Sequence, residues 1–322
     1  MSSSATPLKG SSRVIIEPGE LFALQHQARA FSLSSGAMLA RSGGGHTSRF
    51  RGRGMEYEES RPYQPGDDIR TIDWRVTART GATHTKLFRD ERERPVLIWL
   101  DYRSSMFFAT AGSFKSVLAA RSAALLAWIG QQNGDRVGGM IFNNHNHHEY
   151  RPRRGRQSLL AFLQAAADQQ QWRSEVGAEA DEESHTSSAT TLETALRRLL
   201  RLARPGSLLF LVSDFRGLTG QRSDPARQLL NRLADHSELF LHQIYDPLEE
   251  KLPERGRYPV TDGRRQFLLK PDAKTAMHHR DAFLARQQAL EALAGRAQVG
   301  LLAQTTSEDS VALLQSRLPR IK

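Results

Sequence analysis

Two aspartates, Asp101 and Asp214, are placed where a carboxylate can bind a ligand, because each one ends an apolar run. The runs, Val96–Asp101 and Leu208–Asp214, have the composition of buried parallel strands. Such strands deliver the residue at their end to the carboxyl edge of the sheet, where α/β folds place their ligand sites. Two carboxylates at one edge could hold a hard divalent ion such as Mg²⁺, which prefers oxygen ligands.

Hydroxyl groups and one arginine accompany the two aspartates. Ser105 follows Asp101 in a polar turn, and Thr190 comes just before a segment with a helical pattern. The candidate metal ligands are therefore two carboxylates and two hydroxyls, from Asp101, Ser105, Thr190 and Asp214. The same residues together with Arg103 are the candidate binding site for a partner molecule.

Arg103 disturbs this metal site. A guanidinium has no lone pair to give and is always charged, so Arg103 cannot act as a ligand. It either points to solvent and leaves a weakened site, or folds inward and pairs bidentately with Asp101 or Asp214 as a built-in cation. We therefore expect Mg²⁺ to bind weakly or not at all. A simpler role also stays open, in which the two aspartates cap strand-to-helix junctions.

The elements that must position these residues alternate from Pro95 onward. Strand patterns occur at Val96–Asp101, Val137–Phe142, Glu149–Arg153, Leu208–Asp214, Leu239–Tyr245 and Val299–Ala303. Helical patterns occur at Phe114–Gln132, Gln157–Gln171, Leu192–Leu202, Pro225–Ala234, Ala273–Ala294 and Val311–Leu318. This alternation predicts an α/β fold with a doubly wound, mostly parallel sheet and right-handed crossovers.

The chain before Pro95 differs in composition and predicts a separate module. Residues 1–12 are small and polar and are expected to be a disordered leader. Residues 13–94 are rich in arginine and aspartate and predict a small α+β module, followed by the α/β domain over residues 95–322. Within the module we predict one helix and two strands, at Glu20–Leu39, Met55–Tyr63 and Thr83–Glu91.

Two charged segments favour structural roles over catalysis. Closely spaced acids and arginines in the module predict a buried ion-pair network, since no nucleophile with a neighbouring base accompanies them. These residues are Asp67, Asp68, Arg70, Asp73, Arg75 and Arg79. Residues 174–189 carry acids but no lysine or arginine, and they predict an acidic loop within the α/β domain.

Composition narrows the class of protein. The 322 residues include no cysteine, which excludes disulfides, thiolate nucleophiles and zinc–sulfur sites. Residues 1–7 have no apolar core and no run of about 18 apolar residues occurs, so neither a signal peptide nor a membrane span is predicted. We therefore expect a cytoplasmic protein. The net charge of +10 would allow contact with nucleic acid or an acidic partner, but alternating charges such as Arg89–Arg94 are typical of a solvated surface.

Spaced blocks of residues resemble one bacterial family. The blocks are Gly52–Arg61, Tyr63–Arg70, Ile72–Arg75, Ala78–Thr80, Lys86–Glu91, Gly134–Gly138, Leu211–Phe215, Asp246–Glu249 and Leu252–Pro253. On these residues the chain resembles the family known as domain of unknown function fifty-eight. The resemblance implies a von Willebrand factor A-like domain with a degenerate metal-ion-dependent adhesion site, because Arg103 stands where that motif has its first serine. It also implies a partner, since such proteins typically sit beside MoxR-type AAA+ ATPases as adaptors or targets of those chaperones.

Three functions of different classes follow. The first is a non-enzymatic adaptor that binds a MoxR-type AAA+ ATPase or its client through the strand-end face. The second is a metal-dependent hydrolase that uses Asp101 and Asp214, although no His and carboxylate set with metal spacing supports it. The third is a basic nucleic-acid binder, which lacks aromatic interleaving and any helix-turn-helix or zinc signature. No nucleotide is expected, because the phosphate-binding motif G-x-x-x-x-G-K-S/T is absent.

Overall fold

The computed structural model describes residues 13–33, 55–64, 72–90, 94–168, 190–253, 256–261, 266–269 and 272–318. The chain divides into two units. The larger one comprises residues 1–48 and 94–322, and the smaller one comprises residues 49–93. The expected leader, residues 1–12, and the expected acidic loop, residues 174–189, lie outside the described residues.

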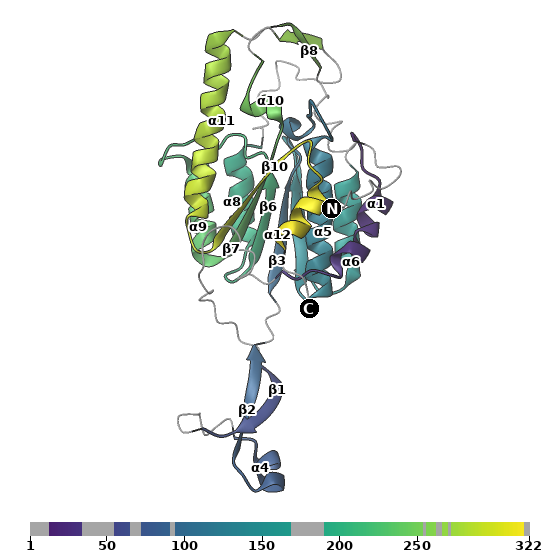
Figure 1. Ribbon diagram of the computed structural model, residues 1–322, viewed down its shortest axis with the longest axis vertical. Coiled ribbons are helices and arrows are strands. Elements are labelled where there is room, and N and C mark those ends of the chain that lie inside the picture. Colours follow the sequence, from purple (N-terminus) through teal and green to yellow (C-terminus); the bar gives the residue numbers. More distant parts are fainter. Residues whose placement is uncertain are drawn as a thin grey trace, which may run out of the picture. The chain divides into compact units, whose positions relative to one another are not determined.

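A six-stranded sheet forms the centre of the larger unit (Figure 1). Its strands are β3 (Pro95–Asp101), β4 (Arg136–Phe142), β5 (His147–Arg153), β6 (Leu208–Ser213), β7 (Glu238–Tyr245) and β10 (Val299–Thr305). They lie in the order β10-β7-β6-β3-β4-β5, and all neighbours are parallel except β4 and β5, which form an antiparallel hairpin at one edge. The predicted doubly wound, mostly parallel sheet is thus confirmed. The order of the strands reverses between β3 and β6, which is where such sheets bind ligands.

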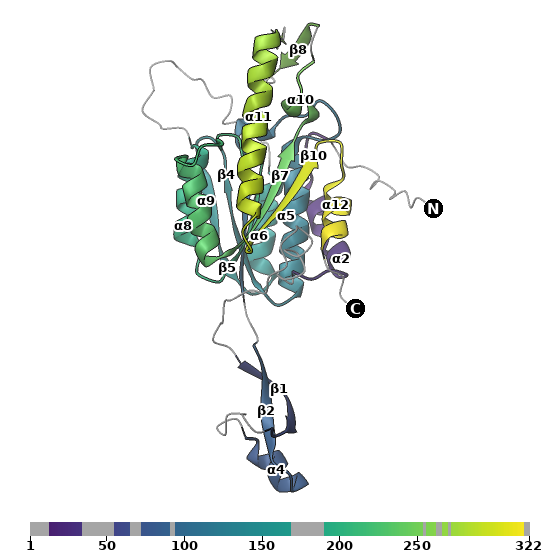
Figure 2. The ribbon, with the colours of Figure 1, turned by 60° about the vertical axis from the view of Figure 1, so that its left-hand side comes forward.

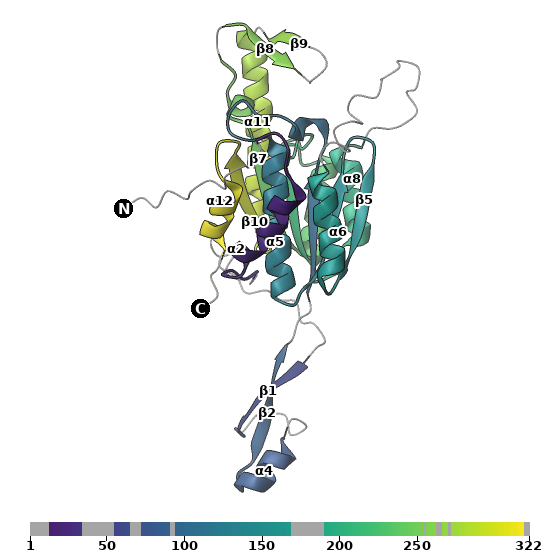
Figure 3. The ribbon, with the colours of Figure 1, turned by 90° about the vertical axis from the view of Figure 1, so that its right-hand side faces the viewer.

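Helices cover both faces of this sheet (Figures 2 and 3). One face is covered by α1 (Pro18–Ala23), α2 (Gln25–Ala28), α5 (Lys115–Gln132), α6 (Arg156–Ala167) and α12 (Ser310–Arg317). The other face is covered by α8 (Leu192–Leu202), α9 (Pro225–His236) and α11 (Ala273–Ala294). The side chains of β3 alternate between the two cores, with Ile98 in the first and Trp99 in the second. Burial on both faces explains why the central strands β3 and β6 read as continuous apolar runs.

Side-chain caps fix where four of the helices begin. Thr191 accepts a hydrogen bond from the backbone N–H of Thr194 at the start of α8. Aspartates do the same for α9, α11 and α12, from Asp224, Asp272 and Asp309. Ser, Thr and Asp are favoured at this position because their oxygens satisfy otherwise unpaired N–H groups. These caps account for the close agreement between the predicted and observed starts of these helices.

The structure draws the boundary of the N-terminal module differently from the prediction. Leu21, Leu24 and Ala28 are buried in the same core as α5, and the Trp128 indole donates a hydrogen bond to the Leu21 carbonyl at 3.0 Å. The segment therefore belongs to the larger unit and not to a module over residues 13–94. In place of one helix over Glu20–Leu39 there are two short helices, α1 and α2, and residues 34–39 lie outside the described part. The apolar spacing predicted a buried face, but it could not say what covers that face.

The smaller unit contains a hairpin and one short helix. The two predicted strands are present as β1 (Met55–Pro62) and β2 (His84–Asp90), which pair antiparallel, with α4 (Trp74–Thr80) between them in the sequence. Helix α4 was not predicted. Asp73 caps it by accepting hydrogen bonds from two backbone N–H groups, and it also accepts one from the Ser60 hydroxyl at 2.9 Å. Three members of the expected ion-pair network, Asp67, Asp68 and Arg70, lie outside the described residues.

Short elements of the larger unit were also missed by the sequence patterns. They are a 3₁₀ turn at Ser104–Met106, helix α10 (Pro247–Glu250), and strands β8 (Tyr258–Thr261) and β9 (Gln266–Leu269), which pair antiparallel. Segments this short present less than one period of a helical or strand pattern, so periodicity cannot reveal them. Helix α10 nevertheless matters for the site, because its residue Glu249 reaches it.

Candidate functional site

Asp101 and Asp214 lie side by side at the carboxyl edge of the sheet. Their strands, β3 and β6, are hydrogen-bonded neighbours, so the predicted proximity of the two residues is confirmed. Both side chains are almost completely buried, with exposed fractions of 0 % and 1 %. A buried carboxylate must be paired and hydrogen-bonded to remain ionised.

Arg103 provides the counter-charge for Asp101 by folding inward. Its Nε and Nη2 donate hydrogen bonds to the two carboxylate oxygens at 3.0 Å and 2.7 Å, which is a bidentate pair. Nη1 donates to the Arg216 carbonyl at 2.9 Å, and Nη2 lies 3.8 Å from Oδ1 of Asp214. Burial by itself would lower the pKa of the guanidinium, but Asp101 and then Asp214 raise it, and the net pKa is raised. Of the two conformations predicted for Arg103, the structure therefore has the built-in cation.

Lys115 provides the counter-charge for Asp214. Its Nζ donates to Oδ2 of Asp214 at 2.9 Å and to Oε1 of Glu249 at 2.6 Å, and its side chain is completely buried. Burial raises the pKa of Asp214, but Lys115 and Arg103 outweigh burial and hold that pKa well below its usual range. Further hydrogen bonds from the Arg216 N–H and from Ser105 act in the same direction. The site is thus a network of paired acidic and basic side chains.

Neutral groups complete this network. The Ser213 hydroxyl donates to Oδ2 of Asp101 at 2.6 Å and accepts from the N–H of Phe215 at 2.8 Å. Phe215 has a φ of 51°, in the left-handed region that residues other than glycine rarely adopt. Its ring is buried in the core under α8 and α9, and this anchoring holds the unfavourable turn in place. The turn directs the next N–H group, that of Arg216, toward Asp214.

Thr190 does not join the network in the way the sequence suggested. It is buried just before α8, and its N–H donates to the carbonyl of Asn144 at 2.5 Å. The Asn144 side chain accepts from the N–H of Ser104 at 2.7 Å, so Asn144 connects the turn after β3 to the start of α8. Within the described part of the chain, the Thr190 hydroxyl makes no hydrogen bond to Asp101 or Asp214.

The donors present do not fit Mg²⁺. Every carboxylate oxygen of Asp101 and Asp214 already accepts a hydrogen bond from an N–H, ammonium or hydroxyl group. Arg103 and Lys115 also cancel the two negative charges that would attract a divalent ion. No cluster of three or more histidine, aspartate and glutamate side chains able to hold a metal occurs among the described residues.

Sequence reasoning missed Lys115 and Glu249. The signal for Lys115 was present, because it is one of only two basic residues in a helix that is otherwise apolar or small, and a lysine is almost never buried without a partner. Glu249 lies in one of the family-like blocks, but α10 is too short to be recognised by periodicity.

A cleft of about 570 Å³ opens beside this network, and we call it the strand-end cleft. Arg103 and the exposed Arg216 line it together with the first residues of two helices, Thr191 to Glu193 of α8 and Asp224 to Ala226 of α9. A helix N-terminus carries partial positive charge. The lining thus combines two guanidinium groups and two helix N-termini, which favour a carboxylate from another molecule, with two acids, Glu193 and Asp224, which oppose it.

Comparisons with known proteins agree with the block pattern. The family model described as protein of unknown function DUF58 matches residues 59–292. Uncharacterized proteins from Mycobacterium bovis and Mycobacterium tuberculosis are each 30% identical over 246 residues, which is 74% of this chain and 72% of theirs. No helix of the described residues is both long and apolar enough to cross a membrane.

Solved structures show more distant similarity. The conserved hypothetical protein BatB from Bacteroides thetaiotaomicron is 14% identical, with a TM-score of 0.38 over 70% of this chain and 95% of its own. A von Willebrand factor type A protein from Catenulispora acidiphila is 12% identical, with a TM-score of 0.32 over 73% of this chain and 42% of its own.

Proposed function

We propose that this chain, which belongs to the DUF58 family of proteins of unknown function, is a non-enzymatic adaptor that binds a protein partner through the strand-end cleft. The observation that carries this proposal is the complete internal pairing of Asp101 and Asp214. A general base or a metal-bound water needs a carboxylate with a free lone pair in reach of substrate. Here those lone pairs are occupied by Arg103, Lys115 and their neighbours. The buried carboxylates thus have a structural role beneath the cleft, and recognition of a partner depends on the groups that line it.

The partner would offer a carboxylate to this cleft. In the adhesion sites that the sequence resembles, a partner's carboxylate completes the coordination of a metal ion. In this chain the exposed Arg216 supplies positive charge at the same sheet edge, next to the internally paired Arg103, so that an aspartate or glutamate side chain of the partner could pair with Arg216 directly. The von Willebrand factor A-like fold and the degenerate adhesion site are part of this proposal.

The family resemblance supplies the class of partner. We propose a MoxR-type AAA+ ATPase, or a client protein that such an ATPase remodels, in the cytoplasm where ATP is available. Electrostatic pairing at an exposed arginine sets association rate and specificity, so binding should weaken from low to physiological salt.

Co-purification of the chain with a MoxR-type ATPase from the same genome tests this function. The measurement uses two salt concentrations, with and without nucleotide. We expect Arg216→Glu to weaken association at least about tenfold, since one charge-assisted pair is replaced by repulsion. Arg232→Glu is the matched control, because Arg232 is exposed on α9 and does not line the cleft. Absence of association in every nucleotide state, or equal losses in both variants, contradicts the proposal.

A further inference from the structure

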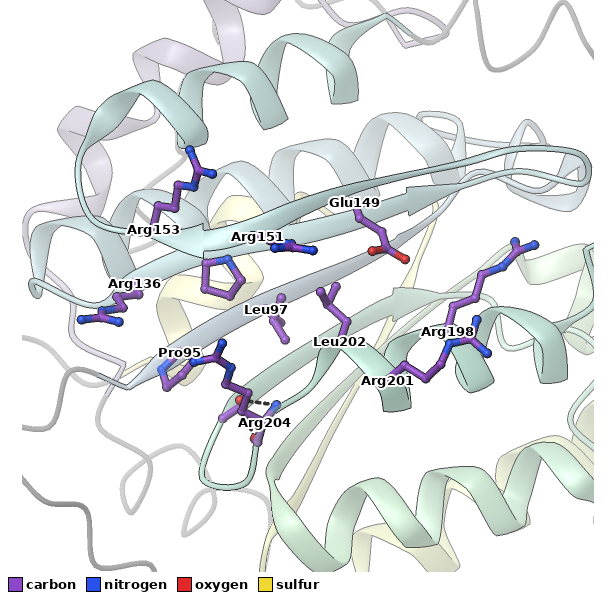
Figure 4. A pocket seen from close by; sticks show the side chains of 12 residues that line it. Pro95, Leu97, Arg136, Glu149, Arg151, Arg153, Arg198, Arg201, Leu202 and Arg204 are labelled. Atoms are coloured by element: carbon purple, nitrogen blue, oxygen red, sulfur yellow. Dashed lines mark hydrogen bonds between the residues drawn. The ribbon is translucent and has the colours of Figure 1, made fainter.

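Six arginines line a second cleft of about 530 Å³, which we call the arginine cleft (Figure 4). Arg151 and Arg153 come from the edge strand β5, Arg136 begins β4, and Arg198, Arg201 and Arg204 come from the end of α8 and the residues after it. Pro95 and Leu97 of β3 and Leu202 give it an apolar component. Pro95 and Arg136 are the first residues of their strands. This cleft therefore lies toward the amino ends of the strands, whereas Asp101 lies at the carboxyl end of β3.

Five of the six arginines make no ion pair within the described part of the chain. These five are Arg151, Arg153, Arg198, Arg201 and Arg204. The neighbouring Arg197, by contrast, pairs with Glu193 at 2.6 Å on the solvent side of α8. Among the described residues, Glu149 is the one acid that lines the cleft. Like charges held this close repel one another, and a ligand of opposite charge would relieve that repulsion.

Arg198 gives a second indication of a ligand. Its Nη1 atom is buried and has no hydrogen-bond partner among the described residues. A buried donor without an acceptor costs about 1–3 kcal/mol, and more when it is charged. An acceptor oxygen brought into the cleft by a ligand would satisfy it.

We propose that the arginine cleft binds an acidic segment of a partner protein in an extended conformation. The arginines are spread along two walls and do not converge on one point. The β5 wall alone, Glu149–Arg153, spans about 13 Å at the usual rise per strand residue, which matches about five residues of an extended chain. Each guanidinium can pair bidentately with one aspartate or glutamate side chain.

Two other anionic ligands fit the cleft less well. None of the described residues that line it is aromatic, so they offer no stacking surface for the bases of a nucleic acid. Compact phosphate sites use backbone N–H groups at a helix N-terminus, whereas α8 presents its C-terminal turn here. The proposal does not depend on the strand-end cleft, and it is tested without any ATPase.

Fluorescence anisotropy with a labelled eight-residue peptide of alternating glutamate and alanine tests this assignment. The double variant Arg151→Gln with Arg201→Gln removes one charge from each wall and should weaken binding at least about tenfold. The matched control, Arg232→Gln with Arg280→Gln, makes the same change in net charge at exposed arginines of α9 and α11 and should shift affinity less than about twofold. Glu149→Gln should tighten binding, because it removes the single acid of the lining.

Two results would contradict the assignment of an acidic ligand to this cleft. Equal losses in the cleft and control variants would mean that the peptide responds only to net charge, and the assignment would be wrong. An oligothymidylate with the same number of charges that binds more tightly, and through the same two arginines, would reassign the cleft to a phosphate ligand. The peptide with glutamine in place of glutamate should not bind in any variant.

Discussion

Arg103 decides the chemistry of the strand-end site at the scale of a single residue. A serine here would remove the positive charge beside Asp101, whose two oxygens now accept hydrogen bonds from Nε and Nη2 of the guanidinium. Lys115, from another element, donates to one oxygen of Asp214. The site therefore contains its cations as part of the polypeptide, and Arg103 stays charged across the physiological pH range.

Substitution of Arg103 tests this interpretation. We expect millimolar Mg²⁺ to leave the melting temperature of the unmodified chain unchanged. Arg103→Ser should lower stability without metal, because Asp101 loses its partner, and should gain a melting temperature that rises with Mg²⁺ by mass action. Arg216→Ser serves as the control for removing one positive charge nearby. Tight Mg²⁺ binding by the unmodified chain in calorimetry would show that the carboxylates are free for a metal.

His242 makes stability depend on pH. Burial lowers its pKa to about 4, although the hydrogen bond between Nε2 and Gln304 at 2.8 Å acts in the opposite direction. The ordinary value in an unfolded chain is about 6.5. The folded state therefore binds fewer protons between these values, and the free energy of unfolding should fall as the pH is lowered from about 6.5 toward 4.

Denaturant unfolding at several pH values measures this effect. His242→Gln should remove the part of the pH dependence that lies in this window, up to about 3 kcal/mol. The exposed His236 on α9 provides a control, since His236→Gln should leave the slope unchanged. If His242→Gln unfolds with the same pH slope as the unmodified chain, another group causes the acid sensitivity.

At the scale of elements, Lys115 connects three of them. It lies in the first turn of α5 and pairs with the residue after β6 and with α10. Lys115→Met should destabilise the fold by about 3–5 kcal/mol, because it leaves the buried Asp214 and the half-buried Glu249 without their shared cation. Adding Asp214→Asn should recover part of that loss. Lys251→Met, at an exposed lysine, should change the free energy of unfolding by less than about 0.5 kcal/mol. A loss at Lys115 no larger than at Lys251 would mean that the pairing contributes nothing.

The elements were more predictable from the sequence than the contacts of the site. A capping residue and a long apolar stripe predict helices such as α8, and continuous apolar runs predict buried strands such as β3. Sequence reasoning also placed Asp101 beside Asp214, since both follow buried parallel strands. It did not foresee the pairing of Lys115, because a contact between residues 99 positions apart depends on how α5 is seated over the sheet.

At the scale of the whole molecule, the smaller unit is an insertion in the larger one. Leu33 and Arg94 lie on either side of it in the sequence, and Nη2 of Arg94 donates a hydrogen bond to the Leu33 carbonyl. Arg94 also pairs with Glu238 at 3.1 Å. Residues of the larger unit that flank the insertion in the sequence thus contact one another directly, and no residue of the insertion takes part in this contact.

Excision of the smaller unit tests this organisation. We expect replacement of residues 49–93 by a four-residue glycine–serine linker to leave the melting temperature of the larger unit within about 4 °C, the shift that roughly 1 kcal/mol produces in a domain of this size. Arg94→Ala in the shortened chain should lower it further, because the closing contact is lost. A shortened chain that does not fold would show that the larger unit needs the inserted residues.

The position of β5 at the sheet edge has a consequence for solubility. An unpaired edge can recruit the edge of a second copy, and proteins oppose this with positive charge, proline and bulges. Strand β5 has all three, with Arg151, Pro152 and an irregular register against Val137–Gly139. The arginines that we assign to an acidic ligand thus also keep identical chains apart. Neutralising them should leave the fold intact but lower the concentration at which the protein self-associates, a change that light scattering would detect.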